Sequence, residues 1–330
     1  SVYSVCVDPN DGVTAYVGMD GGDRVAKSTD GGATWQASGS GIQAGLLVSE
    51  IVVHPGNPSR VLCATSAYSG GSDQGLYRST DGGASWALVT ELSDTQVTRI
   101  SFAHDSSPVA LVSTQNQGLW RSTDSGDTWQ STGPGLNSTR VFDLATDGTA
   151  SPVLFAATDC SLVDGGGIYR STDLGQSWIA INNGLHAGLV SIALDPDDPA
   201  VILGSTNDSG CDGVFISADH GETWRFTAPS DDWVGDLVAT EPDSGQTVYL
   251  AGWQLHKSVD GGHSWMSTTD TIPHSRFSFL AFDESDPTRL FLSARNSHCL
   301  YRSTDAALTW EEVLDRDPTA GLWVDRADPG

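Results

Sequence analysis

The chain alternates short apolar runs with polar turns, and the alternation continues along its whole length. Apolar runs of four to six residues are separated by segments rich in Gly, Pro, Asn and Asp. Runs of this length bounded by turn residues predict β-strands rather than helices. We therefore expect an all-β protein.

The strands fall into groups of four. In one period the expected strands are SEIVVHP (49–55), RVLCATS (60–66), GLYRSTD (75–81) and SWALVTE (85–91). A later period repeats the order with VFDLATD (141–147), PVLFAAT (152–158), GIYRSTD (167–173) and SWIAINN (177–183). Each period thus predicts one four-stranded antiparallel sheet.

A short motif, S-x-D-x-G-x-x-W, marks each period. It occurs seven times, with its tryptophans 41 to 51 residues apart, at 28–35, 79–86, 122–129, 171–178, 217–224, 258–265 and 303–310. This spacing is typical of a four-stranded propeller blade. We therefore predict a seven-bladed β-propeller over residues 1–318, in which each blade buries its faces against its neighbours. Residues 319–330 form a C-terminal tail or an extra strand.

The motif is expected to form the turn between the third and fourth strands. Its Asp can accept hydrogen bonds from the backbone of its own loop, and the Gly permits a positive φ. The Trp is expected to start the fourth strand and to pack back over the turn. The motif is therefore interpreted as a hairpin staple rather than a reaction centre.

The motif resembles the Asp box of bacterial neuraminidase repeats, a family that includes sialidases, xyloglucan-active glycosidases, sortilin-type receptors and a photosystem II assembly factor. The resemblance covers essentially the whole chain. It implies that the motif aspartates are structural and face away from the functional side; they are Asp30, Asp81, Asp124, Asp173, Asp219, Asp260 and Asp305. One copy has Ala307 where the others have Gly, which predicts a distorted last turn.

Composition restricts the partners. The formal net charge of −26 and the pI of about 4.2 disfavour binding to nucleic acid or to anionic lipid. No apolar run reaches the length of a membrane span, so no membrane insertion is expected. The first residues do not resemble a signal peptide, but a secreted chain from which the signal peptide has been cleaved would start in the same way. We expect an extracellular or periplasmic protein.

The five cysteines form no C-x-x-C pair, which argues against a zinc or redox motif. Cys160 and Cys211 lie in equivalent loops of adjacent blades and are expected to form a disulfide, in keeping with an extracellular location. Cys6 and Cys63 lie within strands and are expected to be buried free thiols.

Candidate binding residues are those left over when the repeat is subtracted. Trp120 and the third-strand cations Lys27, Arg78, Arg121, Arg170, Lys257 and Arg302 occupy repeat positions, and we interpret the cations as solvated blade edges. The remainder gather at the end opposite the motif turns, where the loops vary in length and binding is usually placed. These candidates are Tyr68, Arg99, Arg140, Asp143, Trp233, Trp253 and Arg276.

Aligning the first strands gives one further set of equivalent positions around the expected tunnel mouth. The set, called here the first-strand row, is Ser4, Glu50, Arg99, Asp143, Ser191, Asp236 and Phe279. Glu50 and Asp236 belong to blades two and six, and they are the candidate carboxylates if the protein is a glycosidase.

Three functions remain open. A non-catalytic propeller would bind a carbohydrate or a protein, with Trp233 and Trp253 as a stacking platform. A glycosidase would use Glu50 and Asp236. A sialidase would clamp a carboxylate with Arg99, Arg140 and Arg276, but the Arg-Ile-Pro motif is missing and only Tyr3 and Tyr68 are free to act as a nucleophile. The regular blades and short loops favour binding over catalysis.

No cofactor is expected. Calcium has weak support from Asp159, Asp164, Asp208 and Asp212, which lack EF-hand spacing, and His186, His274 and His298 are scattered over different blades. A monomer is expected, with residues 2–8 completing the first blade and residues 321–330 packing outside the ring or leading into a longer parent chain. The alternative is that the tail supplies a strand to another subunit.

Overall fold

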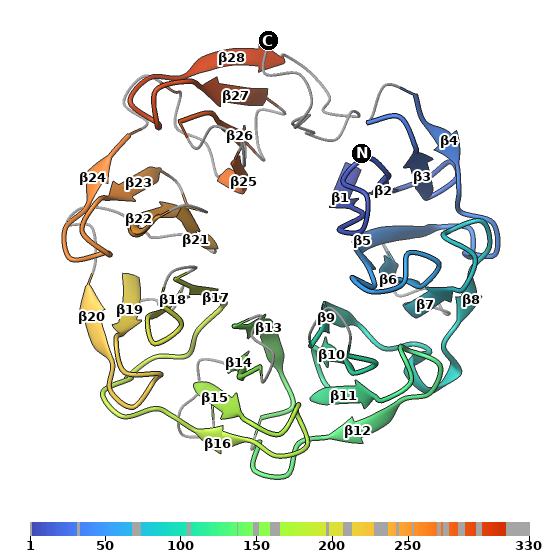
Figure 1. Ribbon diagram of the computed structural model, residues 1–330, viewed down its shortest axis with the longest axis horizontal. Helices are drawn as coiled ribbons and strands as arrows, with labels where there is room; N and C mark the ends of the chain where they lie inside the picture. The colour runs from blue at the N-terminus through green and yellow to red at the C-terminus, as the bar shows by residue number, and fades with distance from the viewer. Residues whose placement is uncertain are drawn as a thin grey trace. The chain divides into compact units, whose positions relative to one another are not determined.

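The computed structural model of the chain (Figure 1) describes residues 2–31, 34–67, 74–103, 107–136, 138–147, 152–158, 166–195, 198–206, 213–227, 237–241, 244–252, 254–268, 272, 277–282, 288–294 and 299–314. They divide into two compact units. Unit 1 contains the described residues of Ser1–Leu154 and Ser171–Trp178, and unit 2 those of Phe155–Arg170 and Ile179–Pro318. Each unit is described by itself.

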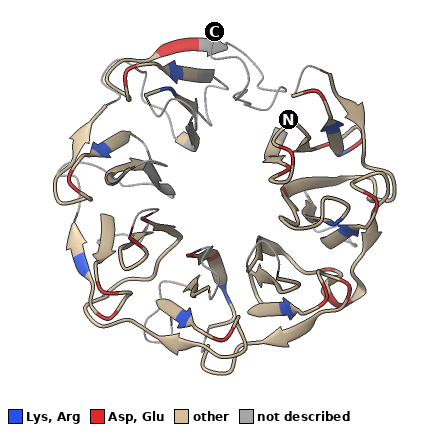
Figure 2. Cartoon of the chain, in the orientation of Figure 1, with Lys and Arg blue, Asp and Glu red and all other residues tan. Residues whose placement is uncertain are grey.

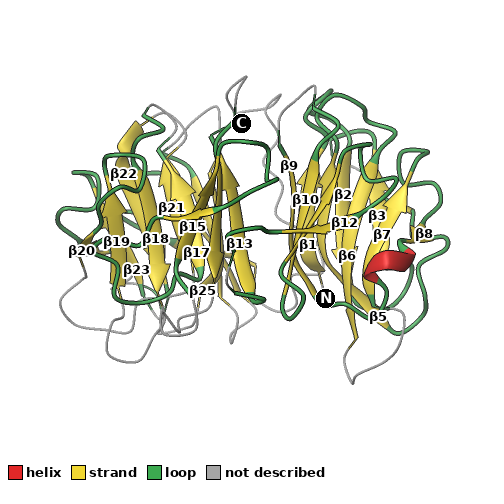
Figure 3. Ribbon diagram, turned by 90° about the horizontal axis from the view of Figure 1, so that it is seen from below, coloured by secondary structure: helices red, strands yellow, loops and turns green. Residues whose placement is uncertain are grey.

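Unit 1 begins with three antiparallel sheets whose strands follow chain order. The first has β1 (Val2–Val7), β2 (Ala15–Met19), β3 (Val25–Ser28) and β4 (Gln36–Ala37). The second has β5 (Leu46–Val53), β6 (Val61–Ala67), β7 (Gly75–Ser79) and β8 (Ala87–Leu88). The third has β9 (Val97–Phe102), β10 (Ala110–Thr114), β11 (Leu119–Ser122) and β12 (Gln130–Thr132), and β13 (Val141–Thr146) follows. The helix η1 (Thr90–Leu92), red in Figure 3, is the only helix within the described residues.

Unit 2 continues the pattern. After β14 (Leu154–Thr158), β15 (Ile168–Ser171) pairs antiparallel with β16 (Ile179–Ala180). Three sheets in chain order follow, formed by β17 (Ser191–Leu194), β18 (Ile202–Thr206), β19 (Gly213–Ser217) and β20 (Arg225–Thr227); by β21 (Leu237–Glu241), β22 (Ser244–Ala251), β23 (Leu255–Ser258) and β24 (Met266–Ser267); and by β25 (Phe277–Phe282), β26 (Leu290–Ala294), β27 (Cys299–Ser303) and β28 (Glu311–Leu314). The prediction of antiparallel sheets with four strands per period is confirmed.

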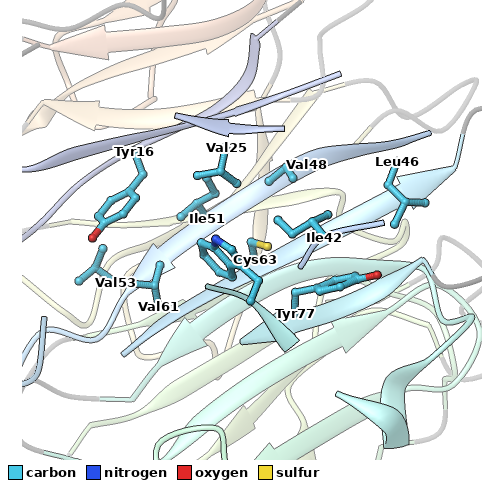
Figure 4. Close-up of a cluster of buried hydrophobic side chains, with 11 residues drawn as sticks. Tyr16, Val25, Ile42, Leu46, Val48, Ile51, Val53, Val61, Cys63 and Tyr77 are labelled. Atoms are coloured by element: carbon cyan, nitrogen blue, oxygen red, sulfur yellow. The ribbon is translucent and has the colours of Figure 1, made fainter. Parts of the chain in front are cut away.

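The hydrophobic core lies between adjacent sheets. Figure 4 shows one cluster of unit 1, in which Tyr16 and Val25 of the first sheet pack against Val48, Ile51 and Val53 of the second. Second strands are buried along most of their length, as in β10 and β18, whereas the fourth strands β4 and β16 are exposed. A single sheet therefore leaves its apolar faces uncovered, and stacking buries them.

The seven S-x-D-x-G-x-x-W segments, called here the repeat turns, share one hydrogen-bond pattern. The motif Ser donates from Oγ to Oδ1 of the motif Asp at 2.7–2.8 Å. The residue before the Trp, always Ser or Thr, donates its backbone N–H to the same oxygen at 2.8–2.9 Å. These bonds lower the pKa of the carboxyl, as the hydroxyl and N–H of Ser85 do for Asp81. In each repeat turn the motif Asp thus accepts hydrogen bonds from its own loop, between the third and fourth strands.

The last repeat turn is not distorted. Ala307 adopts φ +67°, in the same left-handed region as the +77° to +90° of the glycines at the same motif position, which are Gly83, Gly126, Gly175, Gly221 and Gly262. Its N–H still donates to Ser303 Oγ at 2.9 Å, and Asp305 still accepts the N–H of Thr309 at 2.8 Å. The prediction of distortion was therefore wrong, because the hydrogen bonds hold Ala307 in the left-handed conformation at a cost of about 1–2 kcal/mol.

In some copies the repeat-turn Trp also links neighbouring sheets. It lies one residue before the fourth strand, not at its start as predicted. Trp86 donates from Nε1 to the carbonyl of Ser38, which follows the first sheet, at 2.6 Å. Trp224 donates to Ile181, which follows β16, at 2.6 Å. In these two copies the indole therefore joins its own turn to the sheet before it, whereas Trp129 donates to Gly126 O within its own turn at 3.1 Å.

Five of the six third-strand cations make a second link, all except Arg302, and interpreting these five as solvated edges was wrong. Lys27 Nζ donates to the carbonyl of Gly82 in the next repeat turn at 2.8 Å. Arg121 Nε reaches Leu174 O at 2.7 Å, and Lys257 Nζ reaches Ala306 O at 2.7 Å. Figure 2 shows these blue third-strand segments beside turns that carry red acidic residues. The cations bind the next turn because its backbone carbonyl faces them.

Replacing Lys27 by Met should lower the free energy of unfolding by about 1.5–3 kcal/mol, because the carbonyl of Gly82 loses a charged donor at a partly buried site. Urea unfolding measures the loss. Arg225→Met on β20, where the side chain is exposed, should stay within about 0.5 kcal/mol of the parent. Equal losses in both variants would show that the link adds nothing.

Candidate functional site

The first strands of unit 1 carry an irregularity at the same place. The pairing register shifts between Val2 and Ser4 in β1, between Val48 and Glu50 in β5, and between Val97 and Arg99 in β9. A bulge of this kind changes the direction of the side chains and leaves one residue without its ladder hydrogen bonds. The first-strand row thus lies immediately after a bulge in these strands.

Row side chains bind the backbone of the next sheet. Ser4 Oγ accepts the N–H of Ile51 at 3.0 Å, and Glu50 Oε2 accepts the N–H of Ile100 at 2.7 Å. In both cases the donor is the residue that follows the next row position. The row therefore ties neighbouring first strands of unit 1 together.

The ionisable members of the row lie close to one another. Arg99 Nε donates to Asp143 Oδ1 at 2.9 Å, and that oxygen also accepts the N–H of Leu144 at 3.0 Å. The side chain of Asp143 is 10% exposed and that of Arg99 is 44% exposed. The largely buried carboxylate of Asp143 therefore positions Arg99, and part of the Arg99 side chain is exposed at the surface.

Burial dominates the electrostatics of Glu50. It raises the pKa of the Glu50 carboxyl to about 7, against the opposing effects of Arg99 and the Ile100 N–H. Burial alone would lower the pKa of Arg99, but the charges of Asp143 and Glu50 outweigh it and the pKa rises. Glu50 is thus poised to gain or lose a proton near neutral pH.

Only part of the predicted site falls within the described residues. Arg140 is exposed, with its guanidinium 5.4 Å from the centre of the Phe142 ring, and Ser191 is buried at the row position of β17. The side chain of Phe279 lies outside the described residues, as do Tyr68, Trp233, Asp236, Trp253 and Arg276. The proposed Glu50–Asp236 pair therefore stays a prediction. Within unit 1 the structure brings Glu50 to Arg99 and Asp143, a grouping that the alternation of charge along the row could have suggested.

A histidine and a serine approach each other at the repeat-turn end of unit 1. His54 Nε2 lies 3.2 Å from Ser125 Oγ, and Nδ1 accepts the N–H of Gly56 at 3.0 Å. A neutral ring that accepts at Nδ1 carries its proton on Nε2, so the ring donates to Ser125 and cannot activate it as a base. Burial lowers the pKa of His54, which keeps the ring neutral. The pair is a structural contact.

The cysteine predictions are met in part. Cys6 and Cys63 are free thiols; Cys63 is buried and Cys6 is partly exposed. Burial raises the pKa of Cys6 to about 11. Cys160 and Cys211 lie outside the described residues, so the disulfide stays a prediction.

Metal binding finds no support in the described part of the chain, where no three His, Cys, Asp or Glu side chains group around a common point. The candidate calcium ligands Asp159, Asp164, Asp208 and Asp212 lie outside it, as do His274 and His298. Of the helices there, none has the length and apolar character needed to cross a bilayer.

Comparison with known sequences gives partial matches. No family model matches the chain. A xyloglucanase of Paenibacillus is 26% identical over 151 residues, which cover 36% of this chain and 15% of that enzyme. A xyloglucanase of Acetivibrio thermocellus is 29% identical over 167 residues, covering 38% of this chain and 20% of the enzyme. The chain thus spans about a fifth or less of the curated relatives it matches.

Solved structures match over most of the chain. The protein YCF48 bound to a D1 peptide has a TM-score of 0.64 at 20% identity and covers 92% of this chain and 93% of its own. The propeller of Dos1 has a TM-score of 0.68 at 12% identity, covering 95% and 83%. The GH74 enzyme of Niastella koreensis has a TM-score of 0.55 at 17% identity, covering 94% and 65%. At these identities the likeness shows the fold alone, which is that of a β-propeller.

Proposed function

We propose that the chain is a seven-bladed β-propeller that binds a carbohydrate or a protein ligand without catalysis. The repeat turns are its Asp boxes, residues 1–318 form the propeller, and the ligand binds at the end opposite the Asp boxes. The hydrogen bonds shared by the repeat turns support the Asp-box assignment. The similarity to solved β-propellers over more than nine-tenths of the chain supports the fold.

The main support for binding without catalysis is that the carboxylates of the first-strand row are hydrogen-bonded to protein groups. Glu50 Oε2 accepts the N–H of Ile100, and Asp143 Oδ1 accepts from Arg99 and Leu144. Hydrolysis by two carboxylates needs both groups directed at the substrate. In the described part of the row the carboxylates instead hold protein groups, while Arg99 and Arg140 present charge at the surface. That arrangement suits recognition.

A glycan array and a panel of peptides, run beside fluorogenic glycosides, test the proposal. We expect binding without turnover, and Arg140→Ala should weaken it. Arg225→Ala removes an exposed arginine from β20 and is the matched control for charge. Turnover of a glycoside by the parent protein would overturn the proposal.

Changes at the repeat-turn end should affect stability alone. Asp81→Ala removes the acceptor for Ser79 Oγ, Ser85 N and Ser85 Oγ, and should lower the free energy of unfolding by about 1–3 kcal/mol. Thermal melts measure the loss, and titration with a ligand found on the arrays should give an unchanged Kd. Loss of binding at an unchanged melting temperature would place the ligand at the other end.

A glycoside hydrolase is the second candidate, favoured by the xyloglucanase matches and by the raised pKa of Glu50. Neighbouring carboxyl groups with different environments are typical of glycosidase acid/base pairs. If this candidate holds, the protein should cleave xyloglucan oligosaccharides and Glu50→Gln should abolish cleavage. Asp236→Asn tests the pair predicted from the sequence.

The remaining expectations also belong to the proposal. An extracellular or periplasmic location predicts a Cys160–Cys211 disulfide, which thiol labelling before and after reduction would detect. If the protein is a monomer, the variant without residues 319–330 should have the molecular mass of a single chain in solution, as the full-length protein should. Abolished assembly on truncation would favour a strand-donating tail.

A further inference from the structure

Two acids and one base share a small region of unit 1. Glu50, Arg99 and Asp143 lie on the neighbouring first strands β5, β9 and β13, with Arg99 in the middle. Among the described residues Arg99 makes one ion pair, to Asp143 at 2.9 Å, and none to Glu50. Glu50 instead accepts the N–H of Ile100 at 2.7 Å. Within this cluster, one guanidinium thus lies near two carboxyl groups and pairs with only one of them.

Among the described residues, the strands packed against β5 contribute no cation near Glu50 other than Arg99. The elements packed against β5 are β1, β2, β6 and β9. Opposite Glu50 in β6 stands Ala64. Within the bounds of these strands the ionisable side chains are Tyr3 and Cys6 on β1, Tyr16 on β2, Cys63 on β6 and Arg99 on β9. Burial raises the pKa of Cys6, Tyr16 and Cys63, so these three are neutral near pH 7.

We propose that Glu50, Arg99 and Asp143 form a proton-operated switch. While Glu50 holds a proton, Arg99 forms an ion pair with Asp143 alone. When Glu50 releases the proton to solvent, its carboxylate attracts the guanidinium, and Arg99 becomes shared between the two carboxylates. The formal charge of the cluster then changes from zero to −1.

The switch operates near neutral pH because burial raises the pKa of Glu50 to about 7. A group with a raised folded-state pKa binds its proton more tightly in the folded protein than in the unfolded chain. Its contribution to stability is therefore complete below the unfolded pKa of about 4.5 and is lost as the pH rises through about 7. The position of Arg99 should change over the same range as the charge.

Direct observation of the two groups tests the switch in the absence of a ligand. NMR titration from about pH 5 to about pH 9 follows the Glu50 carboxyl carbon and the Arg99 Nε–H. We expect both signals to change with one midpoint near 7. In Glu50→Gln, which keeps a neutral side chain of the same shape, the Arg99 signal should no longer respond. Glu91→Gln changes an exposed acid on η1 and should leave the response intact.

A second variant keeps the test open if Glu50→Gln does not fold. Asp143→Asn frees Arg99 for Glu50, so the midpoint of Glu50 should fall by at least about one pH unit, equivalent to a tenfold change in proton affinity. An Arg99 signal that ignores pH in the parent, or responds equally in Glu50→Gln, would overturn the switch. A Glu50 midpoint unchanged by Asp143→Asn would do the same.

Control of ligand binding by the switch rests on the proposed function and is measured separately. Titrating a ligand found on the arrays at several pH values should give an affinity that changes around pH 7 in the parent and stays flat in Glu50→Gln. A flat profile in the parent beside a normal NMR titration would leave the switch standing and place the ligand elsewhere. Absence of any ligand would count against the proposed function alone.

Discussion

Replacing Gly41 by Ala should lower the free energy of unfolding by about 3–5 kcal/mol. Gly41 has φ +97°, where a Cβ is strained, and that Cβ would lie 2.1 Å from the carbonyl oxygen of Trp86. The obstructing atom belongs to the backbone and cannot rotate away. Moreover, the Trp86 N–H donates to Ser40 O at 2.8 Å, so any shift of the chain breaks a hydrogen bond between two sheets.

Gly45 provides a matched control four positions further along the same crossover. It has φ +86°, but a Cβ there would meet nothing within 4 Å. Gly45→Ala should therefore show only the conformational cost of about 1 kcal/mol. Urea unfolding of both variants separates the two contributions. Similar losses would mean that close approach to Trp86 is unimportant.

Replacing Trp86 by Ala should cost about 3–5 kcal/mol of unfolding free energy. The side chain is 5% exposed, belongs to the core cluster between the first two sheets, and donates from Nε1 to Ser38 O at 2.6 Å. Its removal leaves a cavity and an unpaired carbonyl at the junction. Thermal melts and urea unfolding both report the loss.

Trp86→Phe separates packing from hydrogen bonding. Phe keeps an aromatic ring in the cluster but cannot donate to Ser38, so the expected loss is about 1–3 kcal/mol. A loss below about 1 kcal/mol for Trp86→Ala would mean that the two sheets do not depend on this side chain.

The periodic features were predictable because they depend on local sequence. Apolar runs and turn residues marked the strands, and the spacing of the motif marked each group of four. The Asp81 turn was also predictable, since its donors Ser79 and Ser85 lie within four residues of it. Such contacts need no knowledge of the neighbouring sheet.

Contacts between sheets were not predictable in the same way. Lys27 was assigned to a solvated edge because cations recur at its repeat position, yet it binds the carbonyl of Gly82, which lies 55 residues away. Glu50 and Asp143 were found as equivalent positions by aligning first strands. The alternation of charge along the row could suggest their grouping with Arg99, but the contacts themselves depend on how adjacent first strands pack.

The link from a third-strand cation to the next repeat turn has a consequence for how such a chain can change during evolution. The acceptor in these links is a main-chain carbonyl, and the residues that supply it differ freely: Gly82, Leu174, His220 and Ala306 all serve. A hydrogen bond to a main-chain carbonyl places almost no demand on the side chain of the accepting residue. Neighbouring repeats can therefore diverge, or a repeat can be copied beside an unfamiliar one, while the link between them persists.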